Sequence, residues 1–186
     1  MKNKIRRLIK EKINNFSDTK ESWLLCQAFL KTAIWQKAQN IMIYAPLPGE
    51  VNVSYLLLDQ TKNFIFPKIK NNNELEIYLV KDKKELKIGC FGVLEPREQC
   101  FKISKKELDL IIVPGLAFYK KGDRLGRGKA YYDQFLKTVR CQNKKVVTVS
   151  LIFDFQLLAN IPTEQHDQEI DLVLTQKNLD KMILCD

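Results

Sequence analysis

Residues 108–136 read LDLIIVPGLAFYKKGDRLGRGKAYYDQFL and decide the fold. The first residues are almost all apolar and predict a buried strand that ends at Pro114. Residues 122–129 then hold three glycines and three basic side chains, and residues 129–140 have the apolar spacing of a helix. Because glycine lets a ligand approach the backbone closely, a basic glycine-rich loop before a helix exposes N–H groups to an anion. The segment therefore predicts a phosphate site between a strand and a helix.

Strands and helices alternate along the rest of the chain. From hydrophobic periodicity we expect strands at residues 41–46, 64–69, 74–80, 108–114, 146–153 and 170–175, and helices at residues 4–15, 21–35, 54–60, 129–140 and 155–160. This alternation is typical of an α/β fold, with a mostly parallel sheet and helices on both faces in a three-layer, Rossmann-like arrangement. We expect residues 1–186 to form a single domain. In such sheets ligands bind beyond the carboxyl ends of the strands.

The chain carries a formal net charge of +9, and 45% of its residues are hydrophobic. The charge indicates an anionic partner, either a nucleic acid or a small polyanion, or else only a lysine-rich solvated surface. No apolar run reaches the roughly 18–20 residues that span a membrane, and the basic N-terminus lacks an apolar signal segment. The five cysteines show no CxxC spacing, so we expect reduced thiols, no zinc site and a cytoplasmic protein.

Two standard nucleotide loops do not fit the glycine-rich segment. The pattern GxxxxGK[ST] would need glycine in place of Asp123 and a hydroxyl residue in place of Ala130. The pattern GxGxxG would need glycine in place of Tyr131. The segment therefore predicts a phosphate-binding loop of another kind.

The segment closely resembles the signature of the 5-formyltetrahydrofolate cyclo-ligase family, an RLGxGxGYYD core preceded by PGLAF and a glycine-led turn. Three further segments resemble the family in the same order: LPGEV at residues 47–51, FGVLEP at residues 91–96 and IPTEQHDQEIDLVLT at residues 161–175. Near the start, Lys2 and Arg6 have the family's K-x-x-x-R spacing. The resemblance extends over essentially the whole chain.

This resemblance implies an enzyme that uses ATP and Mg²⁺ to convert 5-formyltetrahydrofolate to 5,10-methenyltetrahydrofolate, releasing ADP and phosphate. The folate supplies both nucleophiles, so no catalytic Ser, Cys or His is required. Positioning and charge neutralisation are then expected to supply most of the rate. The implied partners are two small molecules, ATP and the folate, with no nucleic acid and no membrane, and we expect a monomer.

The resemblance also implies roles for individual residues. Arg127 and Lys129 are expected to act in catalysis by neutralising the transferring phosphoryl group. The residues expected to bind ATP are Lys2, Arg6, Arg124, Leu125, Gly126, Arg127, Gly128, Lys129 and Tyr132. Those expected to contact the folate are Glu50 and Tyr131, and those expected to hold the magnesium ion are Asp133 and Asp167, because Mg²⁺ prefers hard oxygen ligands.

Structural alternatives stand beside several of these roles. Tyr132 lies at helical spacing with the apolar residues of its helix, so core packing is an equal alternative. Asp133 also fits the first turn of a helix, where the helix dipole favours an acid. We expect His166, the only histidine, to be a surface turn residue, since this reaction needs no imidazole base.

The chain departs from the family pattern at a few positions. Ala130 stands where the family commonly has a third glycine, and a methyl group is unfavourable there if φ is positive. Tyr119 stands where Asp is common, and Asn52 and Val53 replace an acidic or polar residue and Thr. Ala130, Asn52 and Val53 leave one alternative to an active ligase, a folate-binding relative that has lost catalysis. The net charge of +9 leaves a second, a basic nucleic-acid-binding protein.

Overall fold

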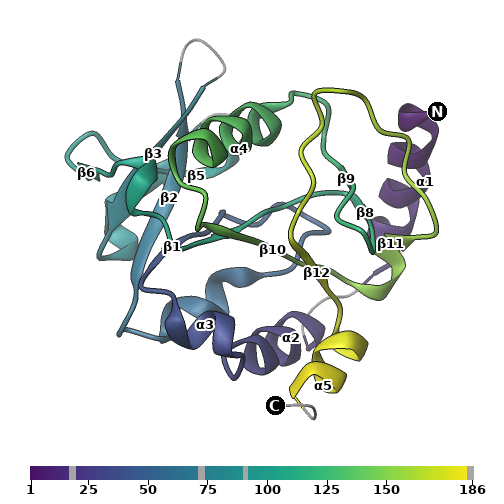
Figure 1. Ribbon diagram of the computed structural model, residues 1–186, viewed down its shortest axis with the longest axis horizontal. Coiled ribbons are helices and arrows are strands. Elements are labelled where there is room, and N and C mark those ends of the chain that lie inside the picture. The colour runs from purple at the N-terminus through teal and green to yellow at the C-terminus, as the bar shows by residue number, and fades with distance from the viewer. Residues whose placement is uncertain (17–19, 71–73, 90–91, 184–186) are drawn as a thin grey trace.

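The structure is a computed structural model that describes residues 1–16, 20–70, 74–89 and 92–183, the side chains of 181–183 excepted. Its central element is a seven-stranded sheet with the order β12-β10-β7-β1-β2-β3-β6 (Figure 1). The strands of this sheet are β1 (Asn40–Met42), β2 (Asn63–Ile69), β3 (Leu75–Val80), β6 (Phe101–Lys102), β7 (Leu110–Ile112), β10 (Val147–Leu151) and β12 (Leu172–Leu174).

Neighbouring strands from β12 to β2 run parallel, whereas β3 and β6 at one edge are antiparallel. Residues 70–74 alone connect β2 to β3, which is too short for the crossover that a parallel pair requires. The expected mostly parallel sheet is therefore confirmed, with an antiparallel edge. The remaining strands form two small sheets, one of β8 (Ala117–Tyr119), β9 (Arg124–Leu125) and β11 (Leu157–Leu158), the other of β4 (Leu86–Ile88) and β5 (Leu94–Pro96).

Helices cover both faces of the large sheet, as expected for a three-layer α/β fold (Figure 1). The α-helices are α1 (Lys2–Asn14), α2 (Glu21–Phe29), α3 (Ala33–Lys37), α4 (Tyr131–Gln142) and α5 (Gln176–Ile183). Because side chains alternate across a strand, Ile41 and Ile43 pack with α2 and α3, while Met42 between them packs with α4. Helix α4 thus covers one face, α2, α3 and α5 cover the other, and α1 lies against β8.

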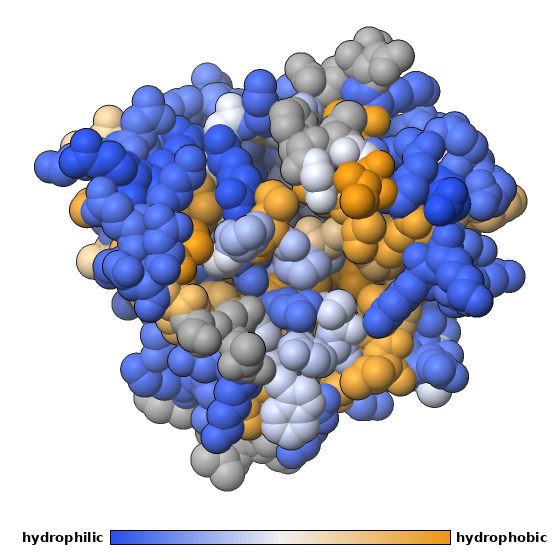
Figure 2. Space-filling view, turned by 180° about the vertical axis from the view of Figure 1, so that it is seen from behind, coloured by the Kyte–Doolittle hydropathy of each residue, from blue (hydrophilic) through white to orange (hydrophobic). Residues whose placement is uncertain are grey.

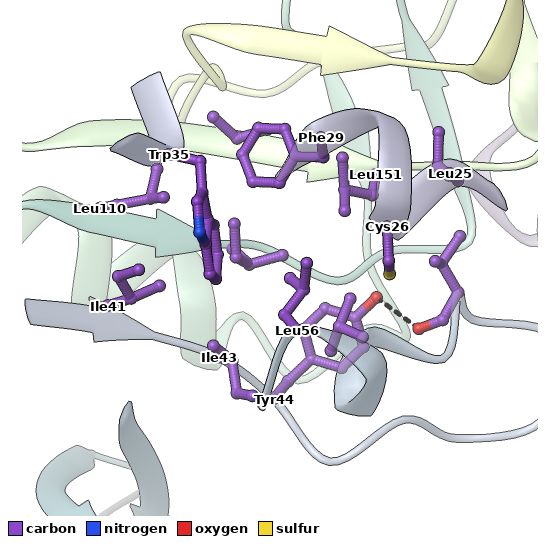
Figure 3. Packing of buried hydrophobic residues seen from close by; sticks show 14 of the residues in the cluster. Leu25, Cys26, Phe29, Trp35, Ile41, Ile43, Tyr44, Leu56, Leu110 and Leu151 are labelled. Carbon is purple, nitrogen blue, oxygen red and sulfur yellow. Dashed lines mark hydrogen bonds between the residues drawn. The ribbon is translucent and has the colours of Figure 1, made fainter. Parts of the chain in front are cut away.

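The core beneath α2 and α3 also holds the loop that follows β1. Phe29 and Trp35 are fully buried there, with ring centroids 5.6 Å apart. Figure 3 shows Tyr44 in the same cluster, where its hydroxyl donates a hydrogen bond to the carbonyl oxygen of Val51 at 3.0 Å. Since Glu50 directly precedes Val51, this bond anchors the loop that presents the glutamate.

Three expected helices differ from the structure. The helix expected at residues 21–35 is interrupted, because Thr32 has an extended backbone and its hydroxyl caps α3 by accepting the N–H of Trp35. The 54–60 segment forms a 3₁₀ helix, and residues 155–160 contribute to another and to β11. Short apolar runs do not distinguish helix from strand by periodicity alone. The 3₁₀ helices span Val53–Leu58, Lys83–Glu85, Lys105–Glu107 and Asp154–Gln156.

Two expectations from composition can be compared with the described residues. Cys100 and Cys141 are free thiols, and the Sγ of the buried Cys26 donates to the carbonyl oxygen of Asn52 at 3.7 Å. Cys90 and Cys185 lie outside the described residues. Within the described ranges, none of the helices combines the length and the apolar character that crossing a membrane requires.

Candidate active site

A cleft of about 880 Å³ opens beyond the carboxyl ends of β1 and β7, where ligands of such sheets bind. Its walls are the N-terminus of α1, the loop after β1, parts of β2 and β5, and residues 124–133 and 162–167. On the face opposite to that of Figure 1, the middle holds weakly hydrophilic side chains with apolar ones beside them, and strongly hydrophilic side chains lie around the edge (Figure 2). Every residue that the sequence associates with ATP, folate or magnesium lines this cleft.

Arg124 is 7% exposed and lies beneath the glycine-rich loop. Its Nη2 donates to Asp133 Oδ1 at 2.8 Å, and its Nη1 donates to the carbonyl oxygen of Pro114 at 3.3 Å. Its Nε and the hydroxyl of Tyr132 are buried and have no hydrogen-bond partner among the described residues. Burial also raises the pKa of the Tyr132 hydroxyl, so the group stays protonated. Two buried donors without acceptors, both on residues that line the cleft, are consistent with an anionic ligand.

Arg127 crosses the cleft to Glu50. Its Nε donates to Glu50 Oε1 at 3.1 Å, and its Nη2 donates to the carbonyl oxygen of Pro48 at 3.3 Å. The other carboxylate oxygen of Glu50 accepts the N–H of Leu47 at 3.0 Å. Burial raises the pKa of Glu50, and the Leu47 N–H and the Arg127 guanidinium offset this only in part. The pair therefore joins the glycine-rich loop to the loop after β1.

Lys2 extends from the first turn of α1 to the last loop of the cleft. Its Nζ lies 2.7 Å from Asp167 Oδ2 and 3.2 Å from Glu164 Oε1. Burial alone would lower the pKa of Lys2, but its hydrogen bonds to the two carboxylates outweigh burial and raise it. Burial would likewise raise the pKa of Asp167, but the hydrogen bonds from Lys2 and from the Glu164 N–H lower it. Both groups therefore stay charged near neutral pH.

Arg6, one turn further along α1, contacts the backbone of the glycine-rich loop. Its Nε donates to the carbonyl oxygen of Gly126 at 3.0 Å, and a Cβ atom at Gly128, where φ is +102°, would lie 3.6 Å from its guanidinium carbon. A Cβ atom at Gly126 would lie 2.8 Å from Arg124 Nη1. The loop glycines therefore let two arginines lie against the backbone.

Ala130 is the one described non-glycine residue with a positive φ, at 53°, and it caps α4 in the left-handed region. Because φ is positive, a methyl group is unfavourable at this position, as expected from the sequence for that case. The other departures from the family pattern lie away from the cleft. Tyr119 packs against a small core cluster, and Val53 is fully buried in the main core. Asn52 caps the adjacent 3₁₀ helix by accepting the N–H of Ser54.

Three further predicted residues lie in the cleft wall with different environments. Lys129 is exposed, and no hydrogen bond or ion pair engages it in the part of the chain that the structure describes. The side chain of Leu125 is buried in the cluster beneath α1, so this residue can meet a ligand only through its backbone. Tyr131 is half-buried and packs beside the core under α4.

The two expected magnesium ligands lie in adjoining segments, because the N–H of Gln168 donates to Asp133 Oδ1 at 3.2 Å. Asp133 Oδ1 and Asp167 Oδ2 accept the hydrogen bonds found at these carboxylates, which leaves one oxygen of each for a cation. Among the described residues, no group of three or more His, Cys, Asp or Glu could hold a metal ion. Mg²⁺ is commonly held by one or two carboxylates together with substrate phosphates and water, so this donor set fits a magnesium ion that arrives with a phosphate.

The sequence did not single out two acidic residues of the cleft. Glu164 is the second partner of Lys2, and Glu95 is 5% exposed on β5. Glu95 belongs to the FGVLEP segment, of which Phe91 lies outside the described residues. His166 has a side chain that is 61% exposed, as expected for a turn, and lies at the rim with its Nε2 3.7 Å from Asp167 Oδ1. A sequence pattern does not reveal which acidic residue a fold buries. Glu95 was therefore noted only as part of the FGVLEP segment and was given no role.

Comparison with known proteins gives matches over nearly the whole chain. The model of the 5-formyltetrahydrofolate cyclo-ligase family matches residues 1–176. The 5-formyltetrahydrofolate cyclo-ligase of Mus musculus is 32% identical over 166 residues, which cover 83% of this chain and 82% of the mouse protein. A probable 5-formyltetrahydrofolate cyclo-ligase of Schizosaccharomyces pombe is 29% identical over 196 residues, 96% of each chain. The NMR structure of Aquifex aeolicus 5,10-methenyltetrahydrofolate synthetase superimposes with a TM-score of 0.83 at 30% identity and covers 95% of this chain and 90% of the other.

Proposed function

The chain belongs to the 5-formyltetrahydrofolate cyclo-ligase family, and we propose that it is a ligase that converts 5-formyltetrahydrofolate to 5,10-methenyltetrahydrofolate with cleavage of ATP to ADP and phosphate. The observation that supports this most directly is the composition of the cleft. Basic side chains from α1 and from the glycine-rich loop line the same cavity as apolar residues of β2 and β3. A cavity of this kind suits a triphosphate beside a flat ring system.

The proposed reaction has two steps, and the folate supplies the nucleophile in both. The formyl oxygen attacks the γ-phosphorus of ATP, the bond to the bridging oxygen breaks, and ADP leaves. N10 of the folate then attacks the activated formyl carbon and releases its proton to solvent. The bond from that carbon to the phosphorylated oxygen breaks, and inorganic phosphate leaves. The protein needs no nucleophile of its own and acts by positioning the two substrates and by stabilising charge on the phosphoryl group.

We propose that Arg127 and Lys129 carry the catalytic charge. Lys129 has no partner among the described residues to compete with phosphate, and Arg127 keeps one side open because its side chain is 37% exposed. Lys2, Arg6 and Arg124 line the same wall and are proposed to bind the triphosphate. We propose that the backbone from Leu125 to Gly128 and the hydroxyl of Tyr132 complete this site. The backbone segment lines the cleft, and the buried Tyr132 hydroxyl has no hydrogen-bond partner among the described residues.

Asp133 and Asp167 are the residues that would hold a magnesium ion. The ion, when bound, supplies charge neutralisation at the phosphate oxygens. In the structure each carboxylate is paired with a basic residue of the site, Asp133 with Arg124 and Asp167 with Lys2. These pairs hold both carboxylates in place at the end of the cleft.

Glu50 and Tyr131 are proposed to contact the folate. Each oxygen of Glu50 accepts one hydrogen bond in the structure, from Arg127 or from the N–H of Leu47. A carboxylate oxygen has a second lone pair, so Glu50 can accept an N–H of the folate while it holds Arg127. We also propose that the enzyme works in the cytoplasm as a monomer of one domain.

The test is to add ATP, Mg²⁺ and 5-formyltetrahydrofolate to the purified protein and to follow the absorbance of methenyltetrahydrofolate. We expect product that depends on ATP and on the divalent ion. Absence of product at high protein concentration, with folate binding intact, would identify a relative that has lost catalysis. Tight binding to random RNA without any response to ATP or folate would contradict the folate function altogether.

A further inference from the structure

Glu95 is a buried carboxylate in the wall of the cleft that no step of the proposed reaction uses. It lies on β5, is 5% exposed, and lines the cavity. Within the described residues one donor approaches it, the N–H of Ile69, at 3.5 Å from Oε1. That distance is at the limit of a hydrogen bond, so most of the accepting capacity of the carboxylate is unused.

No basic side chain of the described residues forms an ion pair with Glu95. Lys68 and Lys87 are close in the fold, since Lys87 lies opposite Glu95 in the β4–β5 ladder, but both direct their ammonium groups to Glu98. The neighbouring cleft wall is apolar, and includes Ile69 and Leu75. A carboxylate removed from water without a charge partner is unfavourable unless donors reach it. The fold therefore retains at this place an acceptor that a ligand can satisfy.

Backbone packing holds the carboxylate where it is. A Cβ atom at Gly89 would lie 2.2 Å from Glu95 Oε2, so the absence of a side chain at position 89 makes room for it. The other acidic residue on this side of the cleft, Glu50, already accepts Arg127 and the N–H of Leu47. Among the described residues, Glu95 therefore accepts fewer and longer hydrogen bonds than Glu50.

We propose that Glu95 recognises the pterin ring of the folate by accepting its N3–H and 2-amino hydrogens. This inference rests on the proposed function. A carboxylate has two adjacent acceptors and no donor, and the pyrimidine half of a pterin presents two adjacent donors, so the two edges match. Adenine presents a donor next to an acceptor, and its acceptor would face a carboxylate oxygen. The flat bicyclic ring would then occupy the apolar part of the cleft.

The position of Glu95 agrees with this arrangement. Strand β5 packs against β2, whereas α1, which carries Lys2 and Arg6, lies on the opposite side of the molecule (Figure 1). A folate bound with its pterin at Glu95 would extend toward the glycine-rich loop and place its formyl group near the phosphates. Glu95 is therefore a binding and specificity residue at the end of the cleft away from the phosphate site.

The test compares two ligands on wild type, Glu95→Gln and Glu95→Leu. The ligands are 5-formyltetrahydrofolate and its 2-desamino-2-methyl analogue, and the dissociation constants are measured by calorimetry without ATP. We expect wild type to bind the analogue about tenfold or more weakly than the natural folate, because a hydrogen bond to a charged acceptor is lost. Glu95→Leu should weaken natural folate by about tenfold or more and bind both ligands equally. Glu95→Gln, with one acceptor, should lie between.

Two controls and two contrary outcomes complete the test. Glu74→Gln makes the same change at an exposed acid near β3 and should leave both dissociation constants unchanged. The KM for ATP should stay within about twofold of wild type in the Glu95 variants, which shows that the phosphate site is folded. If Glu95→Leu still discriminates between the ligands, the inference is wrong. If wild type binds folate with this discrimination but forms no methenyl product, the proposed function fails while the assignment of Glu95 stands.

Discussion

Arg127 Nε donates a hydrogen bond to Glu50 Oε1 across 3.1 Å, although the two residues are 77 positions apart in the sequence. The arginine side chain is 37% exposed and the glutamate side chain only 6%. Glu50 depends on this partner because a buried carboxylate is unfavourable alone, whereas Arg127 keeps nitrogen atoms available for a phosphate. This hydrogen bond therefore joins the residue proposed to contact the folate, Glu50, to the residue proposed to stabilise the phosphoryl group, Arg127.

The first prediction concerns this pair. Arg127→Ala should lower kcat by about a hundredfold or more, because it removes a charge proposed to stabilise the transferring phosphoryl group. The same change should lower the free energy of unfolding by about 1–3 kcal/mol, because it leaves Glu50 buried without a cation. Steady-state assays and urea titrations measure the two effects.

The double variant Arg127→Ala/Glu50→Gln separates these effects. Removing the charge of Glu50 as well should restore much of the free energy of unfolding, because no buried charge then lacks a partner. It should not restore turnover. Near-normal turnover in Arg127→Ala would remove Arg127 from the phosphate role, and equal rescue of both quantities would make its role purely structural.

The second prediction concerns Lys2, whose partner Asp167 is 165 positions away in the sequence. Lys2→Ala should raise the KM for ATP by about tenfold, because a charged hydrogen bond to phosphate contributes roughly this much. Lys4→Ala is the matched control, since Lys4 lies on the same helix with an exposed side chain. Equal KM values for the two variants would show that Lys2 serves only to hold Asp167.

Local patterns in the sequence predicted most of the fold. The apolar run before Pro114 forms β7, and the helix expected at residues 129–140 is α4, displaced by two residues at each end. These elements depend on periodicity within one segment, which a sequence displays directly. Strand β3 was also found, but its antiparallel direction follows from the short connection to β2 and not from its own residues.

The parts that the sequence could not predict depend on contacts between distant segments. Nothing in the N-terminal helix indicates that Lys2 would meet Asp167, or that Arg6 would meet the carbonyl oxygen of Gly126. The burial of Glu95 arises from packing of β5 against β2. The family resemblance singled out residues that the structure brings together in one cleft, but their pairing into three ion pairs became visible only in three dimensions.

The third prediction concerns Ala130, whose φ of 53° lies in the left-handed region. Ala130→Gly should raise the free energy of unfolding by about 1 kcal/mol, because glycine adopts this conformation without steric cost. Ala28→Gly, within α2, is the control and should lower it by about 1 kcal/mol. Thermal unfolding of both variants measures the difference. A loss of stability in Ala130→Gly would show that the alanine side chain has a packing role.

The fourth prediction compares two glycines with positive φ. A Cβ atom at Gly122 would lie 2.2 Å from the carbonyl oxygen of Ile170, whereas one at Gly92 would meet no atom of the described residues within 4 Å. Gly122→Ala should therefore lower the free energy of unfolding by about 3 kcal/mol, from backbone strain plus a clash, and Gly92→Ala by about 1 kcal/mol, from strain alone. Urea titrations of both variants test this. Equal losses would mean that the clash at Gly122 is relieved by a small shift of the backbone.

The fifth prediction concerns pH. Hydrogen bonds from Lys102, Lys70 and the Tyr78 hydroxyl lower the pKa of Glu76 from 4.5 to about 2. Because the pKa is lower in the folded protein, Glu76 contributes stability above its unfolded pKa of 4.5 and loses that contribution as pH falls toward about 2. Glu76→Gln should therefore lower the free energy of unfolding by about 1 kcal/mol at pH 7, a size set by the solvent-screened lysine pairs, and by much less near pH 2. Glu74→Gln, at the exposed neighbouring acid, should show a small difference at every pH. A gap between wild type and Glu76→Gln that stays constant from pH 7 to pH 2 would show that the lysine contacts contribute nothing to folding.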